Sequence, residues 1–227
     1  MLNWLTRSTR PDIGFAVSQA ARFMAFPKRT HEAAVIRICE YLRDTKDEGL
    51  FLKPDNSGFK VWADADFSGG FDRSNPDDSS TAKSRSAYHI MFNGCVIYSY
   101  SKLQTEVALS TTEAEYICLS QSLRTAIVLI RFFTEIAKRI KAFRYTKPKF
   151  CCKAFEDNNG AMTLAGAPTM KPRTKHINLK YHHFKTAVNK GMITLEKVAT
   201  EEQIADIGTK PLEPKVFEYL RKKLVGW

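Results

Sequence analysis

The feature that most constrains the fold is a β-hairpin signal in the first half of the chain. Two runs of aromatic and β-branched residues, 86–92 and 95–100, flank the pair Asn93-Gly94. Asn-Gly is the preferred pair for a two-residue hairpin turn, because both positions of that turn need a positive φ. The sequence therefore predicts two neighbouring antiparallel strands here, and any fold of the chain must contain them.

Strands and helices alternate on either side of this hairpin. Short β-rich runs at 49–52 and 59–64 precede it, separated by turn-forming Pro54, Asn56 and Gly58. Such an order is typical of a mixed sheet with helices on its faces, in the α/β class. The elements predicted after the hairpin are a long helix at about 111–141, a strand at 150–155, a short helix at 158–164, a basic helix at 174–189, a strand at 192–198, and a last helix at 200–210 with capping-box spacing between Thr200 and Gln203.

The amino-terminal part has a different pattern. Pro11 and Asp12 form a helix-start signal, and apolar residues then recur at helical spacing as far as Phe26-Pro27. A second helix is predicted at about 30–42. We therefore divide the chain into a helical tail, residues 1–48, and a main domain, residues 49–227.

Charge favours a polyanionic partner. The 227 residues include 35 Lys and Arg against 24 Asp and Glu, a net charge of +11. Such a surplus is common in nucleic-acid-binding proteins, although a solubilising surface explains the charge alone equally well. No apolar run reaches the roughly 18 residues of a membrane span, and no secretory signal is visible, so no membrane partner is expected. The five cysteines lack a C-x-x-C pair, which favours free thiols in a reducing compartment.

Carboxylates recur where the predicted strands end and the helices begin. Taken singly, each has a structural explanation: a turn after the strand for Asp64, a helix cap for Glu113 or Asp157, and an exposed helix face for Asp206. Together they suggest a cluster at one edge of the sheet. Clustered carboxylates repel one another unless cations neutralise them, and Mg²⁺ prefers such oxygen ligands. Two such ions can catalyse phosphodiester hydrolysis.

Short motifs that occur in a fixed order connect these carboxylates with a known family. The chain resembles the carboxyl-terminal part of a copia-type retrotransposon Pol polyprotein along nearly its whole length. The motifs are Thr9-Arg10-Pro11-Asp12-Ile13, Tyr41-Leu42-Arg43-Asp44-Thr45, Asp64-Ala65-Asp66-Phe67, Ser110-Thr111-Thr112-Glu113-Ala114-Glu115-Tyr116, Asp157-Asn158, Thr174-Lys175-His176-Ile177 and Gln203-Ile204-Ala205-Asp206-Ile207-Gly208-Thr209-Lys210-Pro211-Leu212.

The resemblance implies a ribonuclease H-like fold with a five-stranded mixed sheet and helices on both faces, preceded by the helical end of reverse transcriptase. It also implies hydrolysis of the RNA strand of RNA–DNA hybrids with two Mg²⁺ ions, or Mn²⁺ in their place. Asp64, Glu113, Asp157 and Asp206 match the family's catalytic metal ligands. Glu115 competes with Glu113, since both lie in one motif, whereas Asp66 is assigned to the surroundings of the metals or to the loop.

The resemblance further implies two partners, the RNA–DNA hybrid and the reverse-transcriptase part of the polyprotein, and an intracellular location in cytoplasmic particles. We expect Lys175, His176 and Lys180 to contact the hybrid, while the roles of His176, His182 and His183 stay open between contact and packing. The alternative from another functional class is a non-catalytic hybrid-binding or structural remnant of a decayed retroelement. A third alternative, an integrase-like or phosphatase-like metal enzyme, fits the hairpin order less well.

Overall fold

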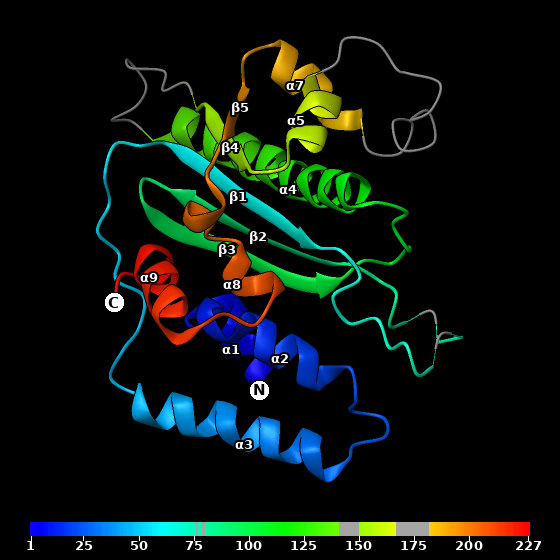
Figure 1. Ribbon diagram of the computed structural model, residues 1–227. Coiled ribbons are helices and arrows are strands. Elements are labelled where there is room, and N and C mark those ends of the chain that lie inside the picture. The colour runs from blue at the N-terminus through cyan, green and yellow to red at the C-terminus, as the bar shows by residue number, and fades with distance from the viewer. Residues whose placement is uncertain (76, 79, 141–149, 167–181) are drawn as a thin grey trace.

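A five-stranded sheet forms the centre of the molecule in the computed structural model, which describes residues 1–75, 77–78, 80–140, 150–166 and 182–227. The predicted hairpin is confirmed, with Asn93 and Gly94 at φ 49° and 78°. The strands lie in the order β3-β2-β1-β4-β5 (Figure 1). They are β1 (Phe59–Asp66), β2 (Arg85–Phe92), β3 (Cys95–Leu103), β4 (Cys152–Glu156) and β5 (Ile193–Lys197).

Strand directions make the sheet mixed. β1 runs antiparallel to β2, and β2 antiparallel to β3, whereas β1, β4 and β5 are parallel to one another. The expected ribonuclease H-like arrangement is thereby confirmed. Parallel strands need a crossover connection, and the long helix that joins β3 to β4 supplies it.

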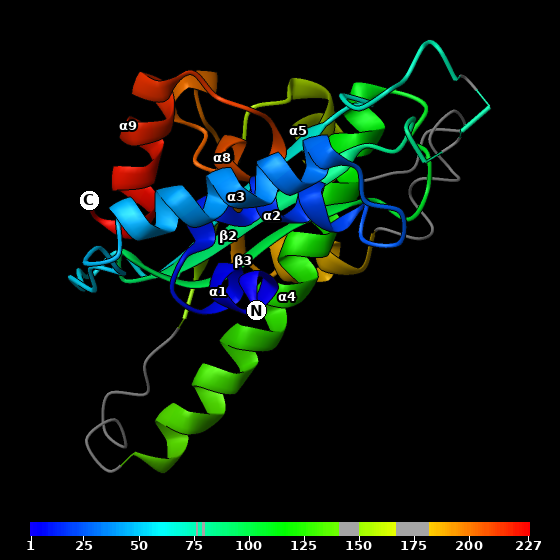
Figure 2. The ribbon, with the colours of Figure 1, turned by 90° about the horizontal axis from the view of Figure 1, so that it is seen from below.

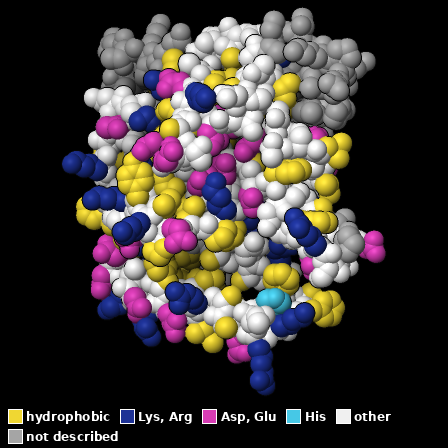
Figure 3. All heavy atoms as spheres, viewed as in Figure 1, with side chains coloured by type: hydrophobic (Ala, Val, Ile, Leu, Met, Phe, Trp, Pro, Cys, Tyr) yellow, Lys and Arg dark blue, Asp and Glu magenta, His cyan; other side chains and the backbone are white. Residues whose placement is uncertain are grey.

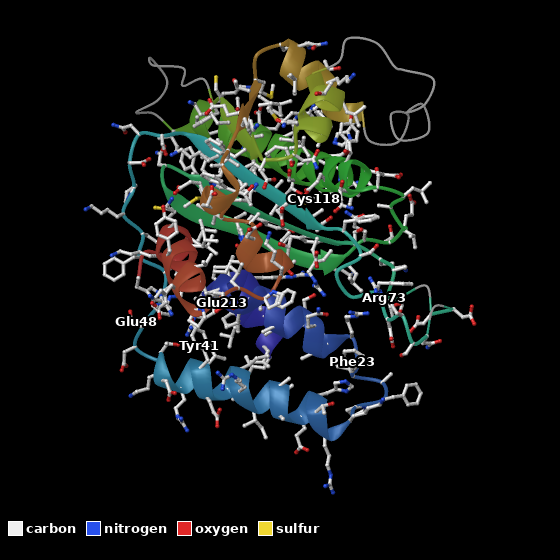
Figure 4. All side chains as sticks on the ribbon, viewed as in Figure 1. Phe23, Tyr41, Glu48, Arg73, Cys118 and Glu213 are labelled. Atoms are coloured by element: carbon white, nitrogen blue, oxygen red, sulfur yellow. The ribbon has the colours of Figure 1, made fainter. Side chains whose placement is uncertain are left out.

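That helix, α4 (Thr111–Arg139), covers one face of the sheet together with α5 (Asn159–Gly166) (Figure 1). Its buried Leu119 and Leu123 share a core with Val61 and Ile90 of the sheet. On the same helix, the Cys118 thiol donates to the carbonyl oxygen of Ala87 in β2 at 3.3 Å (Figure 4). Two short elements lie on this side of the sheet as well, η4 (His182–Phe184) against α4 and α7 (Lys185–Asn189) against β5.

The carboxyl-terminal end of α4 extends beyond the sheet (Figure 2). By length and apolar composition, α4 is the one helix in the described residues that could cross a membrane. Its first half nevertheless packs as the core helix of the domain, which explains the same composition without a membrane.

The opposite face carries the remaining helices, and α3 forms an outer layer beyond them (Figure 1). Helices therefore cover both faces, as expected. They are α1 (Leu2–Ser8), the 3₁₀ turn η1 (Pro11–Ile13), α2 (Gly14–Ala21), α3 (Arg29–Asp44), α8 (Asp206–Thr209) and α9 (Pro214–Val225).

Two local predictions were wrong, and two helices were missed. Residues 49–52 form no strand. The predicted helix 200–210 is instead a 3₁₀ turn, η5 (Thr200–Glu202), followed by the four-residue α8. The reason lies in Gln203, which is fully buried and donates its side-chain amide to the carbonyl oxygen of Ala63 at 2.9 Å instead of completing a capping box. Helices α1 and α9 were not predicted at all.

A buried ion pair fastens the amino-terminal helices together. The Arg10 guanidinium donates to both carboxylate oxygens of Asp12, at 3.1 and 2.9 Å, and both side chains are buried. Tyr41 extends from α3 toward this pair (Figure 4) and donates its hydroxyl to Asp12 at 2.7 Å. The same hydroxyl accepts from Arg221 of α9 at 3.3 Å, so the pair also ties the amino-terminal helices to the last one.

A second contact joins the amino-terminal helices to the sheet. The Arg85 guanidinium of β2 donates to Ser18 Oγ at 2.6 Å and to Gln19 Oε1 at 2.9 Å, both in α2. The proposed boundary between residues 1–48 and 49–227 stays a prediction.

We predict that Asp12→Ala lowers the free energy of unfolding by about 3–5 kcal/mol, because it leaves the buried Arg10 guanidinium without its carboxylate. Urea unfolding followed by circular dichroism measures the change. Asp44→Ala is the control: its pair with Arg43 is exposed, so its loss should leave the free energy of unfolding almost unchanged. Equal losses in the two variants would contradict a structural role for the buried pair.

Candidate metal centre

Two parallel strands end side by side at the candidate centre. Asp64 lies near the end of β1, and β4 ends at Glu156, directly before Asp157. The parallel register places Trp62 opposite Phe155, so the next residues of both strands reach the same edge of the sheet. This edge therefore collects carboxylates from sequence positions far apart.

Helix α4 adds a further carboxylate from its first turns. Glu115 is buried, and its Oε2 accepts from the backbone amide of Ala65 at 2.7 Å. That bond holds Glu115 against the end of β1. As a result, one carboxylate oxygen from each of Asp64, Glu115 and Asp157 lies within 4.8 Å of the others.

Helix α8 brings Asp206 to the same place from the opposite face of the sheet. Thr209 of this helix donates its hydroxyl to Asp64 Oδ2 at 2.5 Å. Lys210 Nζ lies 2.8 Å from Asp206 Oδ2. The charge of Asp206 acts on Asp64, so the two carboxylates are electrostatic neighbours.

Gly208 allows α8 to approach the sheet this closely. A Cβ atom at this position would lie 2.6 Å from the Cβ of Ala87 in β2, which is closer than real side chains come. The Ser101 hydroxyl of β3 donates to the Gly208 carbonyl oxygen at 2.6 Å and fixes the contact. A glycine is needed here so that Asp206 can reach the strand end.

The electrostatics of the centre disfavour several negative charges together. Burial raises the pKa of Asp64, and the charge of Asp206 raises it further. Burial and then the charge of Asp64 raise the pKa of Glu115. Burial opposes the charge of Lys210, but its hydrogen bond to Asp206 and the surrounding carboxylates raise its pKa overall. A single ammonium group therefore offsets part of the negative charge.

The donor set fits a divalent cation. Asp206 Oδ1 is buried and has no hydrogen-bond partner within the described residues, so this oxygen is available to a group that is not among them, such as a cation. The ligand atoms of these four residues are all carboxylate oxygens. Mg²⁺ and Mn²⁺ prefer such oxygen ligands, whereas softer metals prefer sulfur and nitrogen ligands. In the space-filling view, acidic side chains gather in the middle of the face (Figure 3).

Glu113 lies outside this group of carboxylates. Its backbone amide donates to Ser110 Oγ at 3.1 Å, and its Oε2 accepts from the amide of Leu109 at 2.9 Å. These bonds cap the amino terminus of α4. The structure therefore brings Glu115, the competitor, to the other carboxylates, because Glu115 faces the sheet and Glu113 does not.

The other predicted residues lie as follows. Asp157 is not a helix cap, because Asn158 Oδ1 accepts from the Ala161 amide at 3.0 Å and caps α5 in its place. Asp206 is buried and does not lie on an exposed helix face. The Asp66 carboxylate packs against Gly69, and Asp66 does not belong to the close group of three.

Three residues near the centre were missed as individual candidates. Thr209 and Lys210 contact Asp64 and Asp206, and both belong to the last quoted motif, which was a usable signal. Glu156 is fully buried, and its Oε2 has no partner within the described residues. It reads as an ordinary strand residue in the sequence, so nothing there marked it.

The predicted hybrid contacts Lys175, His176 and Lys180 lie outside the described residues, as does the side chain of His182. The His183 side chain is exposed, and burial of part of its ring lowers its pKa. The next residue, Phe184, packs against Tyr116 of α4 with ring centroids 5.8 Å apart.

Comparison with known proteins gives relatives along almost the whole chain. No protein-family model matches it. It is 36% identical over 218 residues to the retrovirus-related Pol polyprotein from transposon TNT 1-94 of Nicotiana tabacum, covering 96% of this chain and 15% of that protein. It is 32% identical over 219 residues to the Pol polyprotein from transposon RE1 of Arabidopsis thaliana, covering 95% and 14% respectively.

Among the solved structures that are similar to this chain is ribonuclease H1 LC11, isolated from compost by a metagenomic approach. That protein is 15% identical, with a TM-score of 0.46, over 67% of this chain and 92% of that chain. The chain spans 15% and 14% of the length of these two Pol polyproteins. With more than 30% identity sustained over 95% of its length, the chain matches a segment of the Pol polyproteins of copia-type retrotransposons.

Proposed function

We propose that this chain is a metal-dependent endonuclease that hydrolyses the RNA strand of RNA–DNA hybrids. The observation that carries the proposal is the meeting of Asp64, Glu115 and Asp157 within 4.8 Å, with Asp206 alongside. Carboxylates this close together repel one another, so the cluster does not stabilise the fold by itself. A divalent cation would neutralise the repulsion, and we therefore interpret the cluster as a cation site.

Asp64, Glu115, Asp157 and Asp206 would hold the cations, Mg²⁺ or Mn²⁺. When bound, a pair of such ions activates a water molecule and stabilises the leaving oxygen of a phosphodiester. The protein keeps the ligands in position: the Thr209 hydroxyl fixes the Asp64 carboxylate, and the Ala65 amide fixes that of Glu115. Such preorganisation is what a hydrolytic centre requires.

The substrate is proposed from the family and the charge. Pol polyproteins of retrotransposons give the context of reverse transcription, in which RNA–DNA hybrids form, and the net charge of +11 suits a polyanion. The reverse-transcriptase part of the polyprotein is the proposed protein partner, since the chain covers only 15% of such a relative.

Glu115→Gln is expected to lower the rate of hybrid cleavage at least about 100-fold, because it removes one charged ligand from the centre. The variant keeps an oxygen that can accept from the Ala65 amide, so the fold is preserved. Cleavage of an RNA–DNA hybrid with end-labelled RNA, in Mg²⁺ and in EDTA, measures the effect.

The matched control is Glu113→Gln, on the same helix turn but bonded to the amide of Leu109. It is expected to cleave at close to the unaltered rate. Loss of cleavage in this control with full cleavage in Glu115→Gln would refute the assignment of ligands. Tight hybrid binding by the unaltered chain with no metal-dependent cleavage would instead favour the non-catalytic module.

Metal binding has a readout that does not depend on cleavage. Since burial and Asp206 raise the pKa of Asp64 in the folded state, this carboxyl is more protonated in the folded than in the unfolded protein between pH about 4 and its raised pKa. The free energy of unfolding in EDTA should therefore fall as the pH rises from about 4 through the raised pKa. Asp64→Asn should remove part of this fall and stabilise the metal-free protein by about 1–3 kcal/mol at pH 8.

Saturating Mg²⁺ should restore stability to the unaltered chain at pH 8, by about 2.7 kcal/mol at 100 times the dissociation constant. It should act little on Asp64→Asn. Thermal unfolding with Mg²⁺ and with EDTA measures both effects, with Asp77→Asn in the exposed loop as the control. Equal Mg²⁺ stabilisation of Asp64→Asn and the unaltered chain would show that the ions bind elsewhere.

A further inference from the structure

A cavity separates the amino-terminal helices from the sheet. Its volume is about 640 Å³, within the usual size of a small-molecule site. Helices α1 and α2 form one wall, strands β2 and β3 the other, and Gly208 of α8 closes it from the side of the carboxylates. The centre described above uses none of this space.

The walls are positively charged. Arg7, Arg22 and Lys102 line the cavity, and no acidic residue does so within the described part of the chain. Arg22 donates to Gln19 Oε1 at 3.2 Å and to the Ser80 carbonyl at 3.5 Å. In contrast, the exposed side chains of Arg7 and Lys102 have no hydrogen-bond or ion-pair partner among the residues that the structure places. Two cations are therefore available to an anion.

A buried histidine forms part of the inner wall. His89 is only 2% exposed, and its Nδ1 pairs with Ser99 Oγ at 2.9 Å. Its Nε2 has no partner within the described residues and faces Gly208, since a Cβ on Gly208 would lie 3.7 Å from it. Burial lowers the pKa of His89 to about 3, so the ring is neutral. A buried polar atom without a partner is costly, and a ligand that reached it would remove this cost.

Hydroxyl groups and aromatic rings complete the lining. The Ser18 hydroxyl and the side chains of Tyr100 and Trp4 line the cavity. The hydroxyls of Thr6 and Ser101 line it too, but they already donate to the carbonyl oxygens of Asn3 and Gly208. Trp4 is 66% exposed, which is unusual for so large an apolar side chain without a partner. Cations beside an open aromatic ring are the usual combination for binding unpaired nucleotides, with the base stacked and the phosphate neutralised.

We propose that this cavity binds a nucleoside phosphate, with phosphate oxygens on Arg7 and Lys102 and the base against Trp4. The inference rests on the proposed function in one respect: we take the nucleotide to be part of a single strand that flanks the cleavage site. The reason is that Gly208, which lines the cavity, lies in the same short helix as Asp206 and Thr209. A free nucleotide is the other source of the same chemistry.

Binding of fluorescein-labelled oligothymidylate, followed by anisotropy in EDTA, tests the proposal without cleavage. Arg7→Ala with Lys102→Ala should weaken binding at least about 10-fold and reduce the slope of log affinity against log salt by about 1.4, for two phosphate contacts on a single strand. The control is Arg37→Ala with Lys215→Ala, which removes the same charge from exposed sites on α3 and α9. Equal weakening by the two double variants would overturn the proposal.

Tryptophan fluorescence reports on the cavity itself. Oligothymidylate should quench the fluorescence of the unaltered chain, and Trp4→Phe should lose most of that quenching, since the indole nitrogens of Trp62 and Trp227 are buried. Quenching that persists in Trp4→Phe would place the nucleotide elsewhere. Thymidine monophosphate as the competitor separates the sources: displacement only by the oligonucleotide supports a strand, and equal displacement by the monophosphate supports a free nucleotide.

Failure of this proposal can be told apart from failure of the proposed function. Asp64→Asn should bind oligothymidylate as tightly as the unaltered chain, because Asp64 does not line the cavity. Oligonucleotide binding that depends on Arg7 and Lys102 supports the cavity site even if no hybrid is cleaved. If the chain cleaves the hybrid but its oligonucleotide binding does not depend on Arg7 and Lys102, the cavity site is overturned and the proposed function is not.

Discussion

The parallel pairing of β1 with β4 determines where the chemistry of this protein can lie. Because the two strands run in the same direction, Asp64 and Asp157 arrive at one edge of the sheet although they are far apart in sequence. Helices on both faces then only have to reach that edge, and they do so with Glu115 from one side and Asp206 from the other. A shift of the register by one residue would point Asp64 to the opposite face and dissolve the group.

The close approach of these carboxylates is electrostatically unfavourable, and the rest of the fold has to compensate for it. Buried carboxylates raise one another's pKa, and Lys210 offsets only part of the charge. The surrounding core supplies the compensation, since α4 packs Leu119 and Leu123 onto the sheet. Functional sites often combine such unfavourable electrostatics with a well-packed scaffold.

Much of the fold could be predicted from the sequence, because the signals for the hairpin and the long helix lie in short, continuous segments. Asn93-Gly94 predicted the hairpin, and the long helix predicted at about 111–141 is present as α4, Thr111–Arg139. The sequence prediction favoured Glu113 over Glu115 as the ligand, but both lie at the start of one helix, and only the packing of that helix decides which of them faces the sheet. Gln203 misled the prediction of the last helix, since its true partner, the Ala63 carbonyl, is 140 residues away. Glu156 carried no signal, because a buried strand glutamate is recognised only by its surroundings.

Helix α8, with four residues, is a wall shared by two spaces: it carries Asp206 and Thr209 toward the carboxylates and Gly208 toward the cavity. The two spaces are therefore separated by the thickness of a single backbone turn. Any ligand that displaces this turn from one side changes the affinity on the other, and thermodynamic linkage makes the effect equal in both directions. Cations at the strand ends and an occupant of the cavity, both of them proposals made above, would then each change the affinity of the protein for the other through this small helix.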